Sequence, residues 1–252
     1  MKITRAVFVL LMIAVLILPT AISHANDSPY QKERETLEAL GLFQGTSKGP
    51  ELSKTMTRAQ AAVVLLRMSG DLTSMASEVG AASLFTDLSS THWAYPYVMH
   101  ATNKGYIKGT STTQFSPEQS VTGKQFITMM LRSLGYVDAQ PQSAAKLAVQ
   151  AGMLSTDAAA RLTSADPFVR GSMVEVMYAM LTTKLKGEEQ TVLNRLVAKG
   201  QVTKEAALAT GLLVEEGNPQ PTPAPEKPVE PETPKDPMDA IEQAIHDKLH
   251  GH

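Results

Sequence analysis

The middle of the chain repeats one pattern of apolar and polar positions three times. In each copy, apolar side chains recur at positions i, i+3, i+4 and i+7, which places them on one face of an α-helix. Only Ser133 interrupts this apolar face. The three sets are Ala61, Val64, Leu65 and Met68; Phe126, Met129, Met130 and Ser133; and Met173, Val176, Met177 and Met180. We interpret the methionines as core residues that fill irregular gaps between packed helices.

Two of these helices are preceded by a capping signal. The sequences Thr-Arg-Ala-Gln at 57–60 and Thr-Gly-Lys-Gln at 122–125 both fit a capping box. In this box the threonine hydroxyl accepts a backbone amide of the first turn, and the glutamine reaches back to the threonine amide. The third copy, Val-Arg-Gly-Ser at 169–172, lacks the threonine. Asp166 and Pro167 are therefore the candidates to start the third helix.

A glycine turn precedes each capped helix at nearly the same distance. The turns begin at Gly41, Gly105 and Gly152. Glycine can end a helix in the left-handed conformation at little steric cost. The helices that the turns end are predicted over 32–40, 94–104 and 144–151. Each unit is therefore a helix, a glycine turn, a loop and a capped helix, and Phe115 and Leu162 are predicted to plug their loops into the core.

The first 25 residues have the features of a secretory signal peptide. Lys2 and Arg5 precede an apolar run over 6–18, and Ser-His-Ala at 23–25 offers small residues at the first and third positions of a cleavage site. The apolar run is shorter than the ~20 residues that a membrane-spanning helix needs. We expect residues 1–25 to be removed, leaving an exported protein that has no membrane partner.

Three segments follow the repeats. Residues 187–217 predict an appended helical pair, because one more apolar face runs over 192–197 and Thr203 is placed to cap a second short helix. Residues 218–237 are rich in proline and predict a disordered, solvated linker. Residues 238–252 carry apolar side chains on one helical face and predict a short helical tail.

Composition narrows the classes of function. The chain has 252 residues, no cysteine and a formal net charge of -2, which excludes disulfides, thiolate chemistry and nucleic-acid binding through bulk positive charge. The sequence contains none of the common motifs of serine hydrolases, zinc proteases, phosphate loops or dinucleotide sites. His246 and His250 have a spacing that can hold a metal, but exposed tail histidines usually bind nothing in particular. We expect no enzymatic activity, no cofactor and no metal site.

The second copy carries a set of short motifs in register with the repeated helices. They are Phe-Thr-Asp at 85–87, His-Trp-Ala at 92–94, Gly-Tyr-Ile-Lys-Gly at 105–109, Phe-Ser-Pro at 115–117 and Thr-Gly-Lys-Gln at 122–125. Together these motifs resemble the S-layer homology (SLH) domain family. The first copy keeps the Gly41 turn and a sequence at 57–60 that is similar to the family's TRAE signature, and Arg170 is the clearest match in the third copy.

The resemblance implies both a fold and a function. The fold is all-α, with three helix-loop-helix SLH repeats over 26–80, 81–136 and 137–186 that pack as a pseudo-threefold spindle. The function is noncovalent attachment of an exported protein to the bacterial cell wall. The family binds an acidic, often pyruvylated, secondary cell wall polysaccharide in grooves between repeats, or modified peptidoglycan in some lineages.

Arg58 and Arg170 are the first candidates for contact with such a glycan. Each occupies the first turn of its helix, where a cation opposes the helix dipole at a cost of ~0.3–1 kcal/mol. Free amides at the same helix end suit an anion, and an arginine beside them can hold a carboxylate through two hydrogen bonds. The alternative is an arginine paired with a neighbouring acid or lying in solvent. Recurrence at one register favours ligand contact.

Three further glycan-binding candidates belong to the second copy. Gly123 replaces the arginine there and Lys124 follows it. One residue along a helix is a rotation of about 100°, so Lys124 need not face the same groove. Trp93, the only tryptophan, is either a platform for a sugar ring or a plug in the core. Asp87 either caps the following helix or hydrogen-bonds a sugar hydroxyl.

Two hypotheses follow for the whole chain. The leading hypothesis is a secreted, cell wall or S-layer associated protein that binds an anionic wall glycan through its repeats. The alternative is a surface adaptor, in which the repeats are a scaffold and the linker and tail over 218–252 recruit a protein partner.

Overall fold

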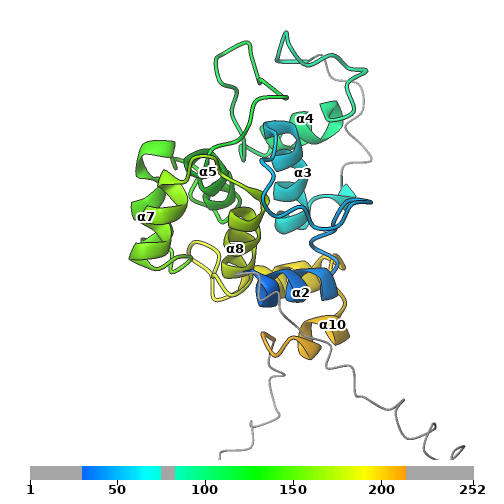
Figure 1. The fold of residues 1–252 in the computed structure, drawn as a ribbon, viewed down its shortest axis with the longest axis vertical. Coiled ribbons are helices and arrows are strands. Elements are labelled where there is room, and N and C mark those ends of the chain that lie inside the picture. Colours follow the sequence, from blue (N-terminus) through cyan, green and yellow to red (C-terminus); the bar gives the residue numbers. More distant parts are fainter. Residues whose placement is uncertain (1–29, 75–82, 214–252) are drawn as a thin grey trace, which may run out of the picture. The chain divides into compact units, whose positions relative to one another are not determined.

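The computed structural model describes residues 30–74 and 83–213, in which helices are connected by turns and loops (Figure 1). Nine α-helices and one 3₁₀ helix follow one another there, and the only β-type pairing in this part is a set of isolated bridges. The predicted all-α fold is confirmed. The predicted signal peptide, linker and tail, at 1–25, 218–237 and 238–252, lie outside the described residues. No helix of the described part combines the length and apolar character that a bilayer crossing requires.

The three helices with the repeated apolar face form the centre of the fold. They are α3 (Arg58–Ser69), α5 (Gly123–Ser133) and α8 (Arg170–Leu181). Both predicted capping boxes are confirmed: the hydroxyls of Thr57 and Thr122 accept the amides of Gln60 and Gln125. The two glutamine side chains accept the threonine amides in return.

Helix α8 starts in a different way from the other two. Its N-cap residue is Val169, and no side chain caps the helix. The expectation that Asp166 and Pro167 start α8 is therefore wrong. The first two amides of α8 instead donate to the carbonyls of Lys54 and Leu52, at 2.8 Å each. Because these backbone carbonyls satisfy the exposed donors of the first turn, the helix needs no capping side chain.

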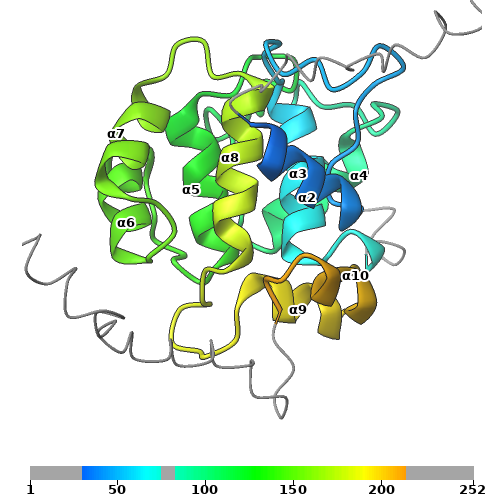
Figure 2. The same cartoon turned by 60° about the horizontal axis from the view of Figure 1, so that its bottom comes forward.

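A shorter helix precedes each glycine turn, as predicted. These helices are α2 (Gln31–Ala39), α4 (Tyr95–Asn103) and α6 (Ala144–Gln150). Gly41, Gly105 and Gly152 end them with φ of 68°, 75° and 67°, the left-handed region that favours glycine. α4 packs on α3, α6 packs on α5, and α2 packs on α8, as Figure 2 shows for α2 and α8. The first unit therefore closes onto the third.

The third unit differs from the prediction in its loop. The 3₁₀ helix η2 (Pro141–Ser143) precedes α6, and a further helix, α7 (Thr156–Ser164), occupies the segment predicted as loop. The hydroxyl of Ser155 accepts the amide of Ala158 and caps α7. Leu162 is buried as predicted, but it reaches the core from a helix. The run of alanines at 158–160 favours this helix over an irregular loop.

Two short helices, α9 (Val192–Ala198) and α10 (Lys204–Ala209), follow α8. The turn between them repeats the glycine turn of the three units. Gly200 has φ of 68°, and the amides of Gln201 and Val202 both donate to the carbonyl of Leu196. Leu42 and Phe43 donate to Leu37 in the same manner. Helix α9 with its turn is thus a fourth copy of the first half of the unit.

One continuous core joins all these elements. Phe115 and Phe126 are fully buried, so the prediction that Phe115 plugs its loop is confirmed. Ser133, the polar exception on the repeated face, is also buried, and its hydroxyl donates to the carbonyl of Met130 at 2.8 Å. Because this bond satisfies the hydroxyl, the serine fits among apolar neighbours.

Candidate functional site

Arg58 is built into the contact between the first two units. Its side chain is 2% exposed. The Nε atom donates to the carbonyl of Phe115 at 2.8 Å, and Nη2 donates to the carbonyl of Lys108 at 3.0 Å. The guanidinium lies 4.7 Å from the centre of the Phe115 ring, a distance typical of a cation–π contact. Arg58 therefore holds the second unit's glycine turn and loop in place.

The amides beside Arg58 are also occupied. The Arg58 amide donates to the carbonyl of Gln119 at 2.9 Å, and the Ala59 amide donates to that of Pro117 at 3.0 Å. The expectation of free first-turn amides for an anion is wrong at this helix, because the loop of the next unit already satisfies them. Any ligand contact by Arg58 must use the rest of its guanidinium.

Arg170 repeats this arrangement between the third and first units. Its Nε atom donates to the carbonyl of Pro50 at 3.1 Å, and Nη2 donates to that of Gln44 at 3.3 Å. Its guanidinium lies 5.4 Å from the centre of the Phe43 ring. The two predicted arginines thus occupy equivalent positions, each clamped to carbonyls and an aromatic ring of the adjacent unit.

The second unit has glycine at this position for a steric reason. A Cβ atom on Gly123 would lie 1.9 Å from the carbonyl oxygen of Leu162 in α7, so no larger side chain fits. Lys124 is exposed and lines a separate cleft of about 590 Å³ with Thr122 and Asp166. Lys124 therefore does not join Arg58 or Arg170.

A polar groove lies beside Arg58, and we call it groove A. Its volume is about 490 Å³. It is lined by Arg58, Lys108, Gly109, Thr110, Gln119, Gln125, Thr128, Met129, Arg132, Gln140 and Pro141. Three of these residues are cations and none is a carboxylate. Lys108 and Arg132 were missed by the sequence reasoning.

Arg132 is held at the wall of groove A much as Arg58 is. Its Nε and Nη2 atoms donate to the carbonyl of Ala139 at 3.0 and 2.8 Å. Burial lowers the pKa of both Arg58 and Arg132 from its ordinary value, because each cation has lost much of its water. Neither forms an ion pair within the described residues. Their Nη1 atoms also donate to no group there, so both guanidinium groups retain bonding capacity.

A second groove, groove B, lies beside Arg170 and has a volume of about 200 Å³. It is lined by Leu42, Phe43, Gln44, Gln60, Val63, Val64, Arg67, Trp93, Arg170, Met173 and Met177. Gln44 and Arg67 stand here in the places that Lys108 and Arg132 have in groove A. Groove B is thus the more apolar of the two. The recurrence of an arginine late in both α3 and α5 was the signal that the sequence reasoning overlooked.

Trp93 lies in groove B and is not a core plug. Its side chain is 53% exposed, and its ring packs 5.7 Å from that of His92 and 6.4 Å from that of Tyr97. The structure therefore puts Trp93 with Arg170, and apart from Arg58.

Asp87 acts on the loop and caps no helix. Its two carboxylate oxygens accept the amides of Phe115 and Ser116, at 2.8 and 2.7 Å. The N-cap residue of α4 is Ala94, without a side-chain cap, so the capping expectation for Asp87 is wrong. The Asp87 charge also acts to raise the pKa of Arg58, against the larger effect of burial. Asp87 thus orients the loop segment whose carbonyl holds Arg58.

Comparison with known proteins finds a family match over part of the chain. The S-layer homology domain family matches residues 84–127, which contain Asp87, Lys108 and the start of α5. This segment is therefore similar to an S-layer homology domain. The match covers the second unit, which has the fullest set of motifs.

Similar proteins include several surface proteins. The Middle cell wall protein of Brevibacillus brevis is 35% identical over 111 residues, which are 44% of this chain and 10% of that protein. Cell surface glycoprotein 1 of Acetivibrio thermocellus is 36% identical over 87 residues, 34% of this chain and 4% of that protein. An endoglucanase of a Bacillus species is 45% identical over 51 residues, 20% of this chain and 5% of the enzyme.

The chain thus spans at most a tenth of the length of these three relatives. The S-layer homology domain and the surface-protein relatives indicate a secreted protein associated with the cell wall. No group of three or more metal-ligating side chains occurs in the described ranges, and His246 and His250 lie outside them.

Proposed function

We propose that this protein attaches noncovalently to the cell wall by binding an anionic wall glycan, with groove A as the principal site. The observation that carries the proposal is the set of three cations in groove A, namely Arg58, Lys108 and Arg132, with no carboxylate among the lining residues. Buried cations without an acidic partner are costly to desolvate. A bound carboxylate would offset part of this cost.

The geometry suits a sugar that bears a carboxylate. Each buried guanidinium is fixed by carbonyls on one side, so little conformational entropy is lost when its remaining donors bind a ligand. A guanidinium can hold a carboxylate through charge-assisted hydrogen bonds. Gln119, Gln125 and Gln140 add amide donors and acceptors for hydroxyl or acetamido groups. A pyruvylated aminosugar of a secondary cell wall polysaccharide combines these groups, as does, less closely, modified peptidoglycan.

Groove B offers a different chemistry to the same polymer. Trp93 presents an exposed ring beside Arg67 and Arg170, and an aromatic face suits the apolar face of a sugar ring. We assign groove B to a neutral part of the glycan and groove A to its charge. Lys124 has no role in either groove under this proposal, and Asp87 acts only through the loop that holds Arg58.

A non-enzymatic role accords with these assignments. The proposal treats the protein as an anchor, and the endoglucanase relative matches it over only 5% of that enzyme's length. The adaptor alternative rests on residues 218–252, which lie outside the described ranges. No contact in the described part favours it.

Retention on purified wall sacculi tests the proposal, and Lys108 is the residue to change. Arg58 and Arg132 also hold the fold together, so a loss of binding on their removal would be ambiguous. The Lys108 side chain is exposed, lines groove A and makes no hydrogen bond or ion pair with the described residues. Lys104, at the end of α4, is exposed and lines neither groove, so Lys104→Glu is a matched control with the same change of charge.

We expect Lys108→Glu to weaken retention by about tenfold or more, since it places a like charge beside the ligand anion. The control Lys104→Glu should stay within about twofold of wild type, because an exposed distant charge is screened by salt. Sacculi stripped of their secondary polymer by acid should fail to retain the wild type. Equal retention of both variants would refute groove A as the site.

A further inference from the structure

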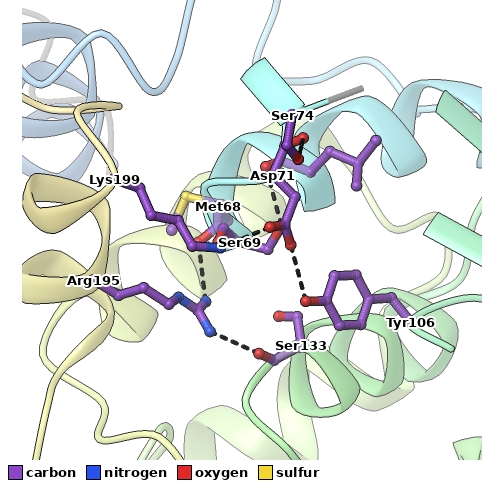
Figure 3. A network of polar contacts seen from close by, with 9 residues as sticks. Met68, Ser69, Asp71, Ser74, Tyr106, Ser133, Arg195 and Lys199 are labelled. Atoms are coloured by element: carbon purple, nitrogen blue, oxygen red, sulfur yellow. Dashed lines mark hydrogen bonds and ion pairs between the residues drawn. The ribbon is translucent and has the colours of Figure 1, made fainter. Parts of the chain in front are cut away.

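Helix α9 carries an arginine that joins the ends of two central helices (Figure 3). The Arg195 Nη1 atom donates to the carbonyl of Ser133 at 2.8 Å, and Nη2 donates to the carbonyl of Met68 at 3.3 Å. Ser133 ends α5, and Met68 lies in the last turn of α3. The carbonyls at the end of a helix lack intrahelical partners and carry partial negative charge. Arg195 therefore satisfies one carbonyl at each of the two helix ends with a single guanidinium.

A second side chain of this region extends the network to a glycine turn. Lys199, the C-cap residue of α9, donates to the carbonyl of Ser69 at 3.1 Å and to Asp71 Oδ1 at 2.7 Å. The hydroxyl of Tyr106 donates to Asp71 Oδ2 at 2.9 Å. Asp71 is 5% exposed. Burial acts to raise its pKa, but the hydrogen bonds from Lys199, Ser69 and Tyr106 outweigh it and hold that pKa below its ordinary value.

The three elements that this network joins are the walls of groove A. Ser133 directly follows Arg132 in α5. Tyr106 belongs to the turn that supplies Lys108, and the Lys108 carbonyl accepts from Arg58. Helix α3 begins with Arg58. Arg132 and Lys108 are thus covalently close to atoms that this network holds, whereas Arg58 lies at the opposite end of α3 from Met68 and Asp71. None of the network residues bonds to the Lys108 side chain.

Groove B has no equivalent network among the residues that the structure describes. Leu42 stands in its glycine turn at the place of Tyr106 and is fully buried in the core. No hydroxyl is present there to reach a carboxylate. The network is therefore specific to the groove with the greater positive charge.

We propose that Tyr106, Asp71, Arg195 and Lys199 are positioning residues of groove A, which keep Lys108 and Arg132 at the separation that an anionic glycan requires. This inference rests on the proposed function of groove A. It assigns a role in recognition to α9, which lies outside residues 84–127 that match the family.

The test uses Tyr106→Phe in the full chain, because this change removes one hydroxyl and keeps the ring. The matched control is Tyr136→Phe, the same change in the turn after α5, where the tyrosine ring contacts the Lys186 ammonium group and its hydroxyl bonds to no described residue. Titration calorimetry with a synthetic pyruvylated aminosugar gives Kd, and circular dichroism verifies that each variant is folded at the temperature used. Lys199→Met is a second variant that breaks the same network from α9.

We expect Tyr106→Phe and Lys199→Met to raise Kd by about three- to tenfold, the scale of coupling through residues that do not touch a ligand. Tyr136→Phe should change it by less than about twofold. A Kd that Tyr106→Phe and Lys199→Met leave unchanged, with wild type binding normally, overturns the positioning role and leaves the proposed function standing. A wild type that fails to bind the probe overturns both.

A double-mutant cycle separates positioning from a general loss of stability. If Tyr106 acts by placing Lys108, Tyr106→Phe should change Kd by less than about twofold in a Lys108→Ala background. An undiminished effect in that background would overturn the assignment, because the hydroxyl would then act on the fold as a whole.

Discussion

The close approach of α7 to the start of α5 makes Gly123→Ala a sharp test of the packing. The added Cβ would lie 1.9 Å from the carbonyl oxygen of Leu162, 3.0 Å from its carbon and 3.1 Å from the Phe168 ring. Two of these atoms belong to the backbone, so relief requires a shift of α7 and not a side-chain rotation. Overpacking of this kind costs ~1–3 kcal/mol, and the gain in helix propensity over glycine is at most ~1 kcal/mol.

The assay for Gly123→Ala is thermal unfolding followed by circular dichroism. Because two of the three close contacts are with backbone, we expect the upper part of this cost, and after the helix-propensity gain is subtracted a net loss of about 1–2 kcal/mol lowers the Tm of a domain of this size by about 2–8 °C. Gly171→Ala is the control, since the three atoms nearest to its added Cβ all belong to the Tyr30 ring, the closest at 2.4 Å, and a side chain can move more easily than backbone. A Tm for Gly123→Ala that equals or exceeds that of wild type would refute the argument that α7 excludes an arginine from the second unit.

Two further predictions concern charged and titratable groups. Arg58→Lys should lower the free energy of unfolding by at least about 2 kcal/mol, because a lysine cannot donate to both the Phe115 and Lys108 carbonyls in this geometry. Urea denaturation measures this free energy. An unchanged denaturation midpoint would contradict the role of Arg58 in holding the two units together. Burial, with the charge of Asp71, raises the pKa of Tyr106 to about 12. The contribution of protonated Tyr106 to stability should therefore be complete below pH 10 and lost as the pH rises from 10 to 12. Tyr106→Phe should flatten this part of the plot of unfolding free energy against pH. An identical slope between pH 10 and 12 in both proteins would contradict this prediction.

The helix caps and glycine turns were predictable because each depends only on residues that are close together in the sequence. Thr57 and Thr122 cap their helices because the hydroxyl and the glutamine partner lie within one turn. The glycine turns likewise depend on a few adjacent residues and one left-handed φ. Helix α7 was missed because its capping serine has no glutamine or glutamate partner in the first turn, and the repeat pattern favoured a loop there.

The sequence indicated Arg58 but not the other two cations of groove A, because the groove is formed by contacts between residues that are far apart in the sequence. Arg58 was recognised as unusual, but its partners are the carbonyls of Phe115 and Lys108, which lie 57 and 50 residues away in the sequence. No pattern within the first unit indicates them. Lys108 and Arg132 join Arg58 only when the second unit packs on the first, so their grouping follows from tertiary structure.

The position of α9 and α10 after the three central helices has a mechanical consequence. Tension that enters through the chain beyond Leu213 reaches α10 and α9 before it reaches any of the three central helices. The bonds of Arg195 and Lys199 are then the first to carry load, while Arg170 and the α2–α8 contact, which close the first unit onto the third, remain shielded. A pull on the chain beyond Leu213 would thus loosen groove A before the three central helices separate, and under the proposed function it would weaken attachment to the glycan.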